Sequence, residues 1–263
     1  MKKDLIKKDL IIGSEGQIAK AIYKCYGNNK NKVLRYDLDS EEHILTANED
    51  NIRCMHICIP CKDKDKFIDI VDNYIYEVKP EIVIIHSTIP LGTSREIYKH
   101  LCDKTIIVHS PCKGKHPDLY KSIKQTFTKY FGVIPNSDIA WHKVMGIFVK
   151  LFDKSYYAGK PENTEMAKIL CTTEYAWHIS IATEFKRYCK ENNVDFNLVY
   201  NEFRKDYNEG YKEMGLGKFT RPMLEPCKDK ILGHCVKENL VNLLKPYMKP
   251  TWLTDIKPKR LIK

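Results

Sequence analysis

The chain has 263 residues, of which 43% are hydrophobic and 30% are charged, and its formal net charge is +10. This length suffices for one large domain or two smaller ones, and the composition is ordinary for a globular protein. No apolar run approaches the ~20 residues that a membrane-spanning helix needs. The first residues are charged and lack the apolar segment of a signal peptide. We therefore expect a cytoplasmic protein with no membrane partner.

The positive charge is spread along the sequence, and its densest run is a short C-terminal tail (Lys257, Lys259, Arg260 and Lys263). Neither a zinc-finger spacing nor a basic stripe with interleaved aromatic residues is present, so nucleic acid is not the expected partner. A cationic pocket for a phosphate-bearing ligand is the better functional interpretation of the charge.

The ten cysteines show no repeating spacing, and several lie within apolar runs, where a free thiol behaves as a small hydrophobic group. Without a secretory signal, a disulfide framework is not expected. Cys58 and Cys61 form a C-x-x-C pair, but no second pair lies at zinc-finger distance. The sequence therefore predicts no metal site.

Short apolar runs alternate with amphipathic segments through the first 160 residues, the pattern of a parallel βαβ sheet. We expect strands at residues 9–13, 32–37, 51–60, 81–86, 105–109, 130–134 and 155–158. We expect helices at residues 17–26, 64–77, 93–101 and 139–152. The fold class is α/β, with a Rossmann doubly wound parallel sheet in a domain at residues 1–160.

The character of the sequence changes after Pro161, because residues 164–192 contain neither Pro nor Gly and carry apolar residues at helical spacing. This predicts one long helix with Thr164 as its N-cap, followed by shorter helices at residues 196–214 and 235–244. Residues 161–263 are therefore expected to form an all-α domain.

A glycine-rich turn follows the first expected strand and opens the first expected helix, which is the setting of a dinucleotide fingerprint. Ser14, Gly16 and Ala19 occupy the three positions of G-x-G-x-x-G/A, and Asp37 ends the second expected strand. A carboxylate there accepts hydrogen bonds from the ribose of NAD and repels the 2′-phosphate of NADP. A tight turn without a ligand is the alternative. The expected NAD contacts are Gly13, Ser14, Glu15, Gly16, Gln17, Ile18, Asp37, Ile59, Pro60, Ser87 and Thr88.

Three further motifs occur in the order in which one enzyme family carries them. The segment from His86 to Thr93 is similar to an S-T-x-P-x-G-T turn. Glu165-Met-Ala-Lys168, with Ile181-Ala-Thr-Glu184, is similar to an E-x-x-K…A-x-E helix, and Gly233-His-Cys235 is similar to a loop with a nucleophilic cysteine. On these motifs the sequence resembles the UDP-glucose/GDP-mannose dehydrogenase family, within the 6-phosphogluconate dehydrogenase-like superfamily.

This resemblance implies an NAD-dependent oxidoreductase that moves a hydride between nicotinamide and a carbinol of a nucleotide-sugar or small anionic hydroxy substrate. By resemblance, Thr88 contacts the substrate, Lys168 stabilises the alkoxide, and Cys235 captures an aldehyde. The helical domain would then serve substrate binding and dimerisation, which implies a homodimer.

The sequence departs from the family's pattern at its acidic positions. Ser110-Pro-Cys112 stands where the family has S-P-E, Thr172 replaces an asparagine, and Asn239 replaces an aspartate. The chain also ends soon after Cys235, so we expect it to lack the family's C-terminal nucleotide-sugar domain. Because carboxylates activate water for thioester hydrolysis, a four-electron oxidation is not expected.

Two readings of these departures stay open. In the first, His109 or His116 takes over acid–base work, with His116 standing where the family has a second glutamate, and supports a two-electron oxidation. In the second, the chain is a catalytically reduced relative that binds NAD or a nucleotide as a sensor or scaffold. Lys168 and Cys235 also have plain interpretations, as a solvated lysine and a buried thiol.

Overall fold

The computed structural model describes residues 7–38, 51–101, 105–114 and 119–227. The chain divides into two compact units, residues 1–168 and 169–263. The assignment of an NAD-binding domain to residues 1–160 and of a substrate and dimerisation domain to residues 161–263 stays a prediction.

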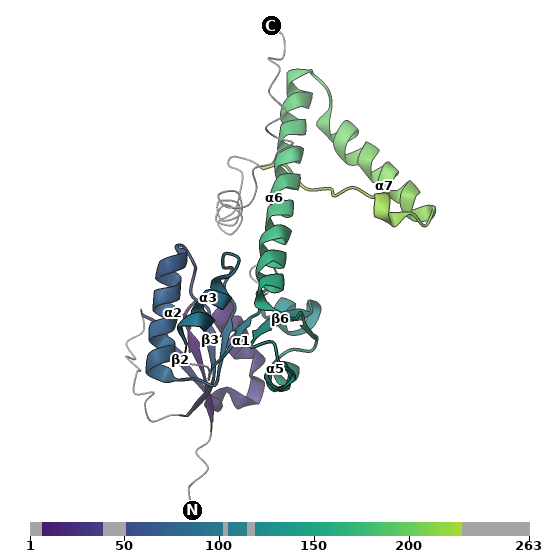
Figure 1. The fold of residues 1–263 in the computed structure, drawn as a ribbon. Coiled ribbons are helices and arrows are strands. Elements are labelled where there is room, and N and C mark those ends of the chain that lie inside the picture. Colours follow the sequence, from purple (N-terminus) through teal and green to yellow (C-terminus); the bar gives the residue numbers. More distant parts are fainter. Residues whose placement is uncertain (1–6, 39–50, 102–104, 115–118, 228–263) are drawn as a thin grey trace, which may run out of the picture. The chain divides into compact units, whose positions relative to one another are not determined.

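The first unit is built on a seven-stranded sheet in the order β2-β1-β3-β4-β5-β6-β7 (Figure 1). Its strands are β1 (Lys8–Ile12), β2 (Val33–Tyr36), β3 (Ile52–Ile57), β4 (Ile82–Ile85), β5 (Ile106–His109), β6 (Lys129–Ile134) and β7 (Ser155–Tyr157). Strands β1 to β5 pair in parallel. Because β2 and β3 flank β1 on opposite sides, the strand order reverses there, which is where open α/β sheets bind ligands. The predicted Rossmann-type fold is confirmed.

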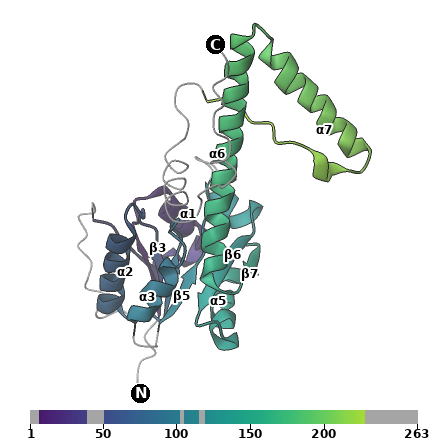
Figure 2. The same cartoon turned by 45° about the horizontal axis from the view of Figure 1, so that its top comes forward.

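Helices cover both faces of this sheet, because successive strand residues point to opposite sides. Ile11, Ile82 and Ile84 pack with α1 (Gln17–Cys25) and α5 (Asp138–Leu151). Leu10 and Ile12 pack on the other face with α2 (Lys64–Val78) and α3 (Thr93–His100) (Figure 2). The central strands are buried on both sides, as their continuous apolar runs predict.

Strand β6 departs from the predicted parallel arrangement, because it pairs antiparallel with β5, and β7 pairs parallel with β6. The connection between β5 and β6 contains two helical turns that the sequence did not predict, α4 (Leu119–Lys121) and η2 (Ser122–Thr126). A chain that returns antiparallel starts its next strand at the edge where the previous one ended. Lys129, the first residue of β6, therefore lies beside the residues that follow β5.

The predicted long helix is present as α6 (Pro161–Glu191), which begins in the first unit and continues into the second. The prediction of Thr164 as its N-cap is wrong. The helix begins at Pro161, whose missing N–H costs nothing in a first helical turn. The Thr164 hydroxyl instead lies in that turn and bonds to His109.

In the second unit, η3 (Asn197–Glu202) continues directly into α7 (Phe203–Glu213), which confirms the helix predicted at residues 196–214. The short turn η4 (Gly217–Phe219) follows. Asn208 ties the segment after η4 to α7 through hydrogen bonds with the backbone of Arg221. The helix expected at residues 235–244 lies outside the described residues. No helix within the described ranges is long and apolar enough to cross a membrane.

We predict that Gly13→Ala destabilises the protein by about 1–3 kcal/mol. Gly13 has φ +78°, and an added Cβ would lie 2.9 Å from Ile59 Cγ2. Urea denaturation measures the change. Gly146→Ala is the matched control, because its Cβ would meet no atom within 4 Å, and alanine in a helix interior stabilises by about 0.5–1 kcal/mol. Equal stability of Gly13→Ala and the wild type would contradict the prediction.

Candidate functional site

A tight glycine turn joins β1 to α1 at the point where the strand order reverses. The amides of Gly13 and Ser14 donate to the Tyr36 carbonyl at 2.9 and 3.1 Å, and the Gly16 amide donates to the Gly13 carbonyl at 3.1 Å. Gly13 adopts a positive φ and lies too close to Ile59 for a side chain. A backbone that carries no side chain at this crevice leaves room for a diphosphate beside the start of α1.

Asp37 follows β2 and is tied to this turn, because its Oδ2 accepts a hydrogen bond from the Glu15 amide at 2.8 Å. The Glu15 carboxylate pairs with Lys20 at 3.0 Å and with Arg35 at 2.6 Å. A hydrogen bond from Lys20 and the charges of both cations lower the pKa of Glu15. These cations offset the negative charge that Glu15 brings to the turn.

The remaining predicted cofactor residues follow β3, β4 and the start of α1. Ile59 and Pro60 come directly after β3, and the Ser87 hydroxyl donates to the Ile59 carbonyl. Thr88 is half-buried one residue further on. Gln17 and Ile18 form the first turn of α1. The turn residues, Asp37, Ile59, Pro60, Ser87 and Thr88 thus all follow the carboxyl ends of parallel strands.

The start of α6 is fixed against this edge of the sheet. The Glu165 carboxylate accepts hydrogen bonds from the amides of Gly92 at 2.6 Å and Ser94 at 2.9 Å, at the beginning of α3. Lys168, one turn further along α6, donates from Nζ to the Cys112 carbonyl at 3.0 Å. The E-x-x-K segment is therefore bonded to both the S-T-x-P-x-G-T turn and the Ser-Pro-Cys segment.

His109 links the start of α6 to the segment that follows β4. Its Nε2 donates to the Ser87 carbonyl at 3.1 Å, and its Nδ1 accepts the Thr164 hydroxyl proton at 2.8 Å. Burial lowers the pKa of His109 to about 3, so the ring is neutral. Because both ring nitrogens are engaged, neither is available to a substrate.

A buried lysine that the sequence analysis did not single out lies beside Cys112. Lys129 is 3% exposed, and its Nζ donates to the carbonyls of Ser110 at 2.7 Å and Pro111 at 3.1 Å and to Cys112 Sγ at 3.1 Å. A thiol and a buried ammonium therefore stand where the resembled family has a carboxylate. In the sequence, Lys129 could have been noticed because it directly precedes the apolar run at residues 130–134.

From Lys129 a chain of buried polar side chains crosses the sheet. His86 Nδ1 lies 3.2 Å from Lys129 Nζ, and His86 Nε2 lies 2.9 Å from His56 Nδ1. His56 Nε2 lies 2.7 Å from the Tyr26 hydroxyl, which donates to Asp9 Oδ2 at 2.8 Å. The sequence signal for this chain was a histidine, His56, within the apolar strand β3.

Burial keeps both histidines of this chain neutral. It lowers the pKa of His56 to about 4, and it lowers the pKa of His86 well below its ordinary value, with the Lys129 charge acting in the same direction. The rings are stacked, 7° from parallel, with centroids 5.2 Å apart.

The other predicted catalytic residues are not brought together by the described structure. His116 and Cys235 lie outside the described residues. Thr172 lies on α6 one turn after Lys168 and belongs to the second unit. Their predicted roles are therefore proposals.

Comparisons with known proteins agree with this architecture, although no family model matches the chain. The chain is 29% identical over 147 residues to a UDP-N-acetyl-D-mannosamine dehydrogenase of Methanocaldococcus jannaschii, covering 52% of this chain and 34% of that protein. The chain thus matches about a third of the length of this curated relative. The predicted resemblance to nucleotide-sugar dehydrogenases is confirmed over that part.

Two solved structures share the fold. A UDP-glucose dehydrogenase of Pyrobaculum islandicum has a TM-score of 0.61 at 13% identity, covering 93% of this chain and 65% of that one. The 3-hydroxyisobutyrate dehydrogenase of Mycobacterium tuberculosis has a TM-score of 0.57 at 12% identity, covering 78% of this chain and 70% of that one. At these identities the likeness establishes the Rossmann-like fold.

We predict that His56, His86 and His109 stay neutral in the folded protein down to about pH 5, because burial lowers the pKa of each. Unfolded histidines take up protons near pH 6.5, so the unfolded state binds more protons below that pH, and stability falls as the pH drops from about 6.5 toward 4. Ring resonances in NMR spectra test the first statement, with the urea-unfolded chain as control. Titration of any of the three rings above pH 6 would contradict it.

Proposed function

We propose that the chain is an NAD-dependent oxidoreductase of the nucleotide-sugar dehydrogenase type. The observation that carries this proposal is that the glycine turn after β1 and the Lys168 ammonium, bonded to the segment after β5, both belong to the carboxyl edge of one parallel sheet. Open α/β sheets bind cofactor and substrate at this edge. The dehydrogenases with similar sequence or fold support the same reaction class.

Both the backbone conformation of the glycine turn and the charges around it suit a dinucleotide. Gly13 and Gly16 leave no side chain over the crevice, and the start of α1 supplies amides and a positive dipole end for the diphosphate. Asp37 lies at the end of β2, where a carboxylate accepts ribose hydroxyl protons. Ile59, Pro60, Ser87 and Thr88, which follow β3 and β4, would line the nicotinamide side.

Lys168 is the group that we propose acts on the substrate. When bound, nicotinamide accepts or returns the hydride. The carbinol oxygen gains negative charge as its proton and hydride leave, and an ammonium held by its bond to the Cys112 carbonyl stabilises that charge. Thr88 would position the substrate hydroxyl, with Thr172 one turn beyond Lys168 on the same helix.

The expected reaction transfers two electrons. Cys112 stands where the resembled family has a carboxylate that would activate water. Its sulfur accepts a hydrogen bond from Lys129 Nζ. His116 would carry the proton in this scheme, and Cys235 would assist as a thiol nucleophile. A nucleotide-sugar or a small anionic hydroxy compound is the proposed substrate, and a homodimer is the proposed assembly.

The replacement of that carboxylate also favours a second candidate, an NAD- or nucleotide-binding sensor without turnover. The two candidates differ in one observable. A sensor binds the dinucleotide and produces no NADH with any member of a panel of UDP-sugars and hydroxy acids.

We predict that Lys168→Met lowers kcat by about 10²–10³-fold and leaves NAD affinity within about twofold of the wild type. The lost ammonium would stabilise charge that develops only during the reaction, so binding is spared. NADH absorbance measures turnover, and calorimetry measures affinity. Lys186→Met, an exposed lysine further along the same helix, is the control and keeps full activity. Equal turnover of Lys168→Met and Lys186→Met would overturn the role of Lys168.

A further inference from the structure

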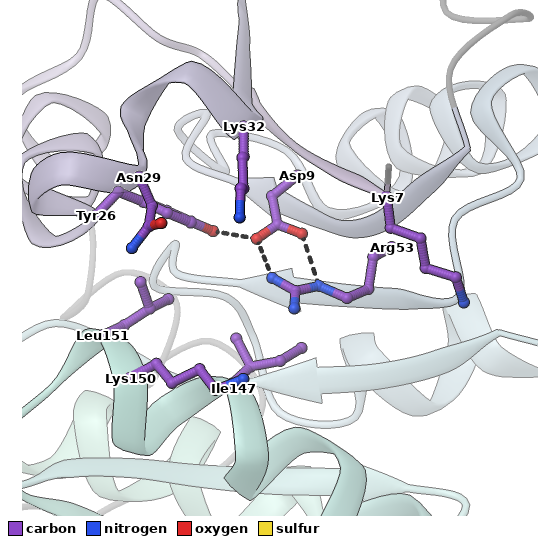
Figure 3. A pocket seen from close by; sticks show the side chains of 9 residues that line it. All are labelled: Lys7, Asp9, Tyr26, Asn29, Lys32, Arg53, Ile147, Lys150 and Leu151. Atoms are coloured by element: carbon purple, nitrogen blue, oxygen red, sulfur yellow. Dashed lines mark hydrogen bonds and ion pairs between the residues drawn. The ribbon is translucent and has the colours of Figure 1, made fainter. Parts of the chain in front are cut away.

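A second cavity in the first unit lies where β1, β2 and β3 begin, apart from the glycine turn at their other ends (Figure 3). Its volume is about 470 Å³. Lys7 precedes β1, Lys32 precedes β2, and Asp9 and Arg53 are the second residues of β1 and β3. Further lining residues are Tyr26, Asn29, Ile147, Lys150 and Leu151.

The residues that line this pocket carry a net positive charge. Four lining residues are cationic, and Asp9 is the one lining carboxylate. Asp9 accepts two hydrogen bonds from the Arg53 guanidinium, and Lys7 pairs with Glu81. Within the described residues, Lys32 and Lys150 form no ion pair. Two unneutralised ammonium groups beside a fixed guanidinium attract an anion, and phosphate oxygens suit both kinds of cation.

We propose that this pocket binds a phosphate-bearing anion. The anion would bind Lys32, Lys150 and the exposed side of Arg53. Ile147 and Leu151 form an apolar wall against which the rest of the ligand would pack.

Calorimetry with inorganic pyrophosphate tests the binding site. Lys32→Gln/Lys150→Gln is expected to weaken binding by at least about tenfold, because it removes two charge-assisted contacts. Lys24→Gln/Lys99→Gln changes the net charge equally at exposed positions outside the pocket and is expected to bind as the wild type does. Pyrophosphate bound at the glycine turn would be insensitive to both double variants, and that result overturns the site. Tighter binding of ADP than of pyrophosphate, lost in the pocket variant, would assign a nucleotide as the ligand.

Discussion

The arrangement of the first unit depends on how closely the ends of β1 and β3 approach each other. At Gly13 the backbone has a positive φ, and a side chain would collide with Ile59. This approach brings the turn after β1, the start of α1 and the residues after β3 to one crevice at the place where the strand order reverses. The crevice is therefore bordered by backbone without side chains and by the N-terminus of α1, a setting that suits a diphosphate. The candidate cofactor site is a consequence of that packing.

A second constraint acts inside the sheet. The central strands are buried on both faces, so every polar side chain on them needs a partner. Asp9, Tyr26, His56, His86 and Lys129 are joined by hydrogen bonds in a single chain, which explains why these polar residues persist in an apolar core. The antiparallel return of β6 completes this chain, because it brings Lys129 to the edge where β5 ends. The same lysine then joins the core network to Cys112, at the edge that also holds Lys168.

The sequence predicted what local patterns encode and missed what depends on pairing between distant segments. Alternating apolar runs predicted strands β1 to β5, and the unbroken helical period predicted α6. The glycine turn and the Glu165–Lys168 motif were found because their spacing is short. The direction of β6 was missed, because no local pattern distinguishes a parallel from an antiparallel strand. The chain from Asp9 to Lys129 was missed for a related reason, since its members are single polar residues in five separate segments. His109, a candidate acid–base group by sequence, is engaged at both nitrogens by tertiary contacts.

The glycine turn and Asp37 are proposed to hold a dinucleotide with a free ribose 2′-hydroxyl. Calorimetric titration of the full chain with NADH and, separately, with NADPH measures this binding. We expect saturable NADH binding with a dissociation constant in the micromolar range, about −8 kcal/mol, and weaker binding of NADPH, because Asp37 repels the 2′-phosphate. No heat with NADH at high protein concentration, or tighter binding of NADPH than of NADH, would rule out this dinucleotide site.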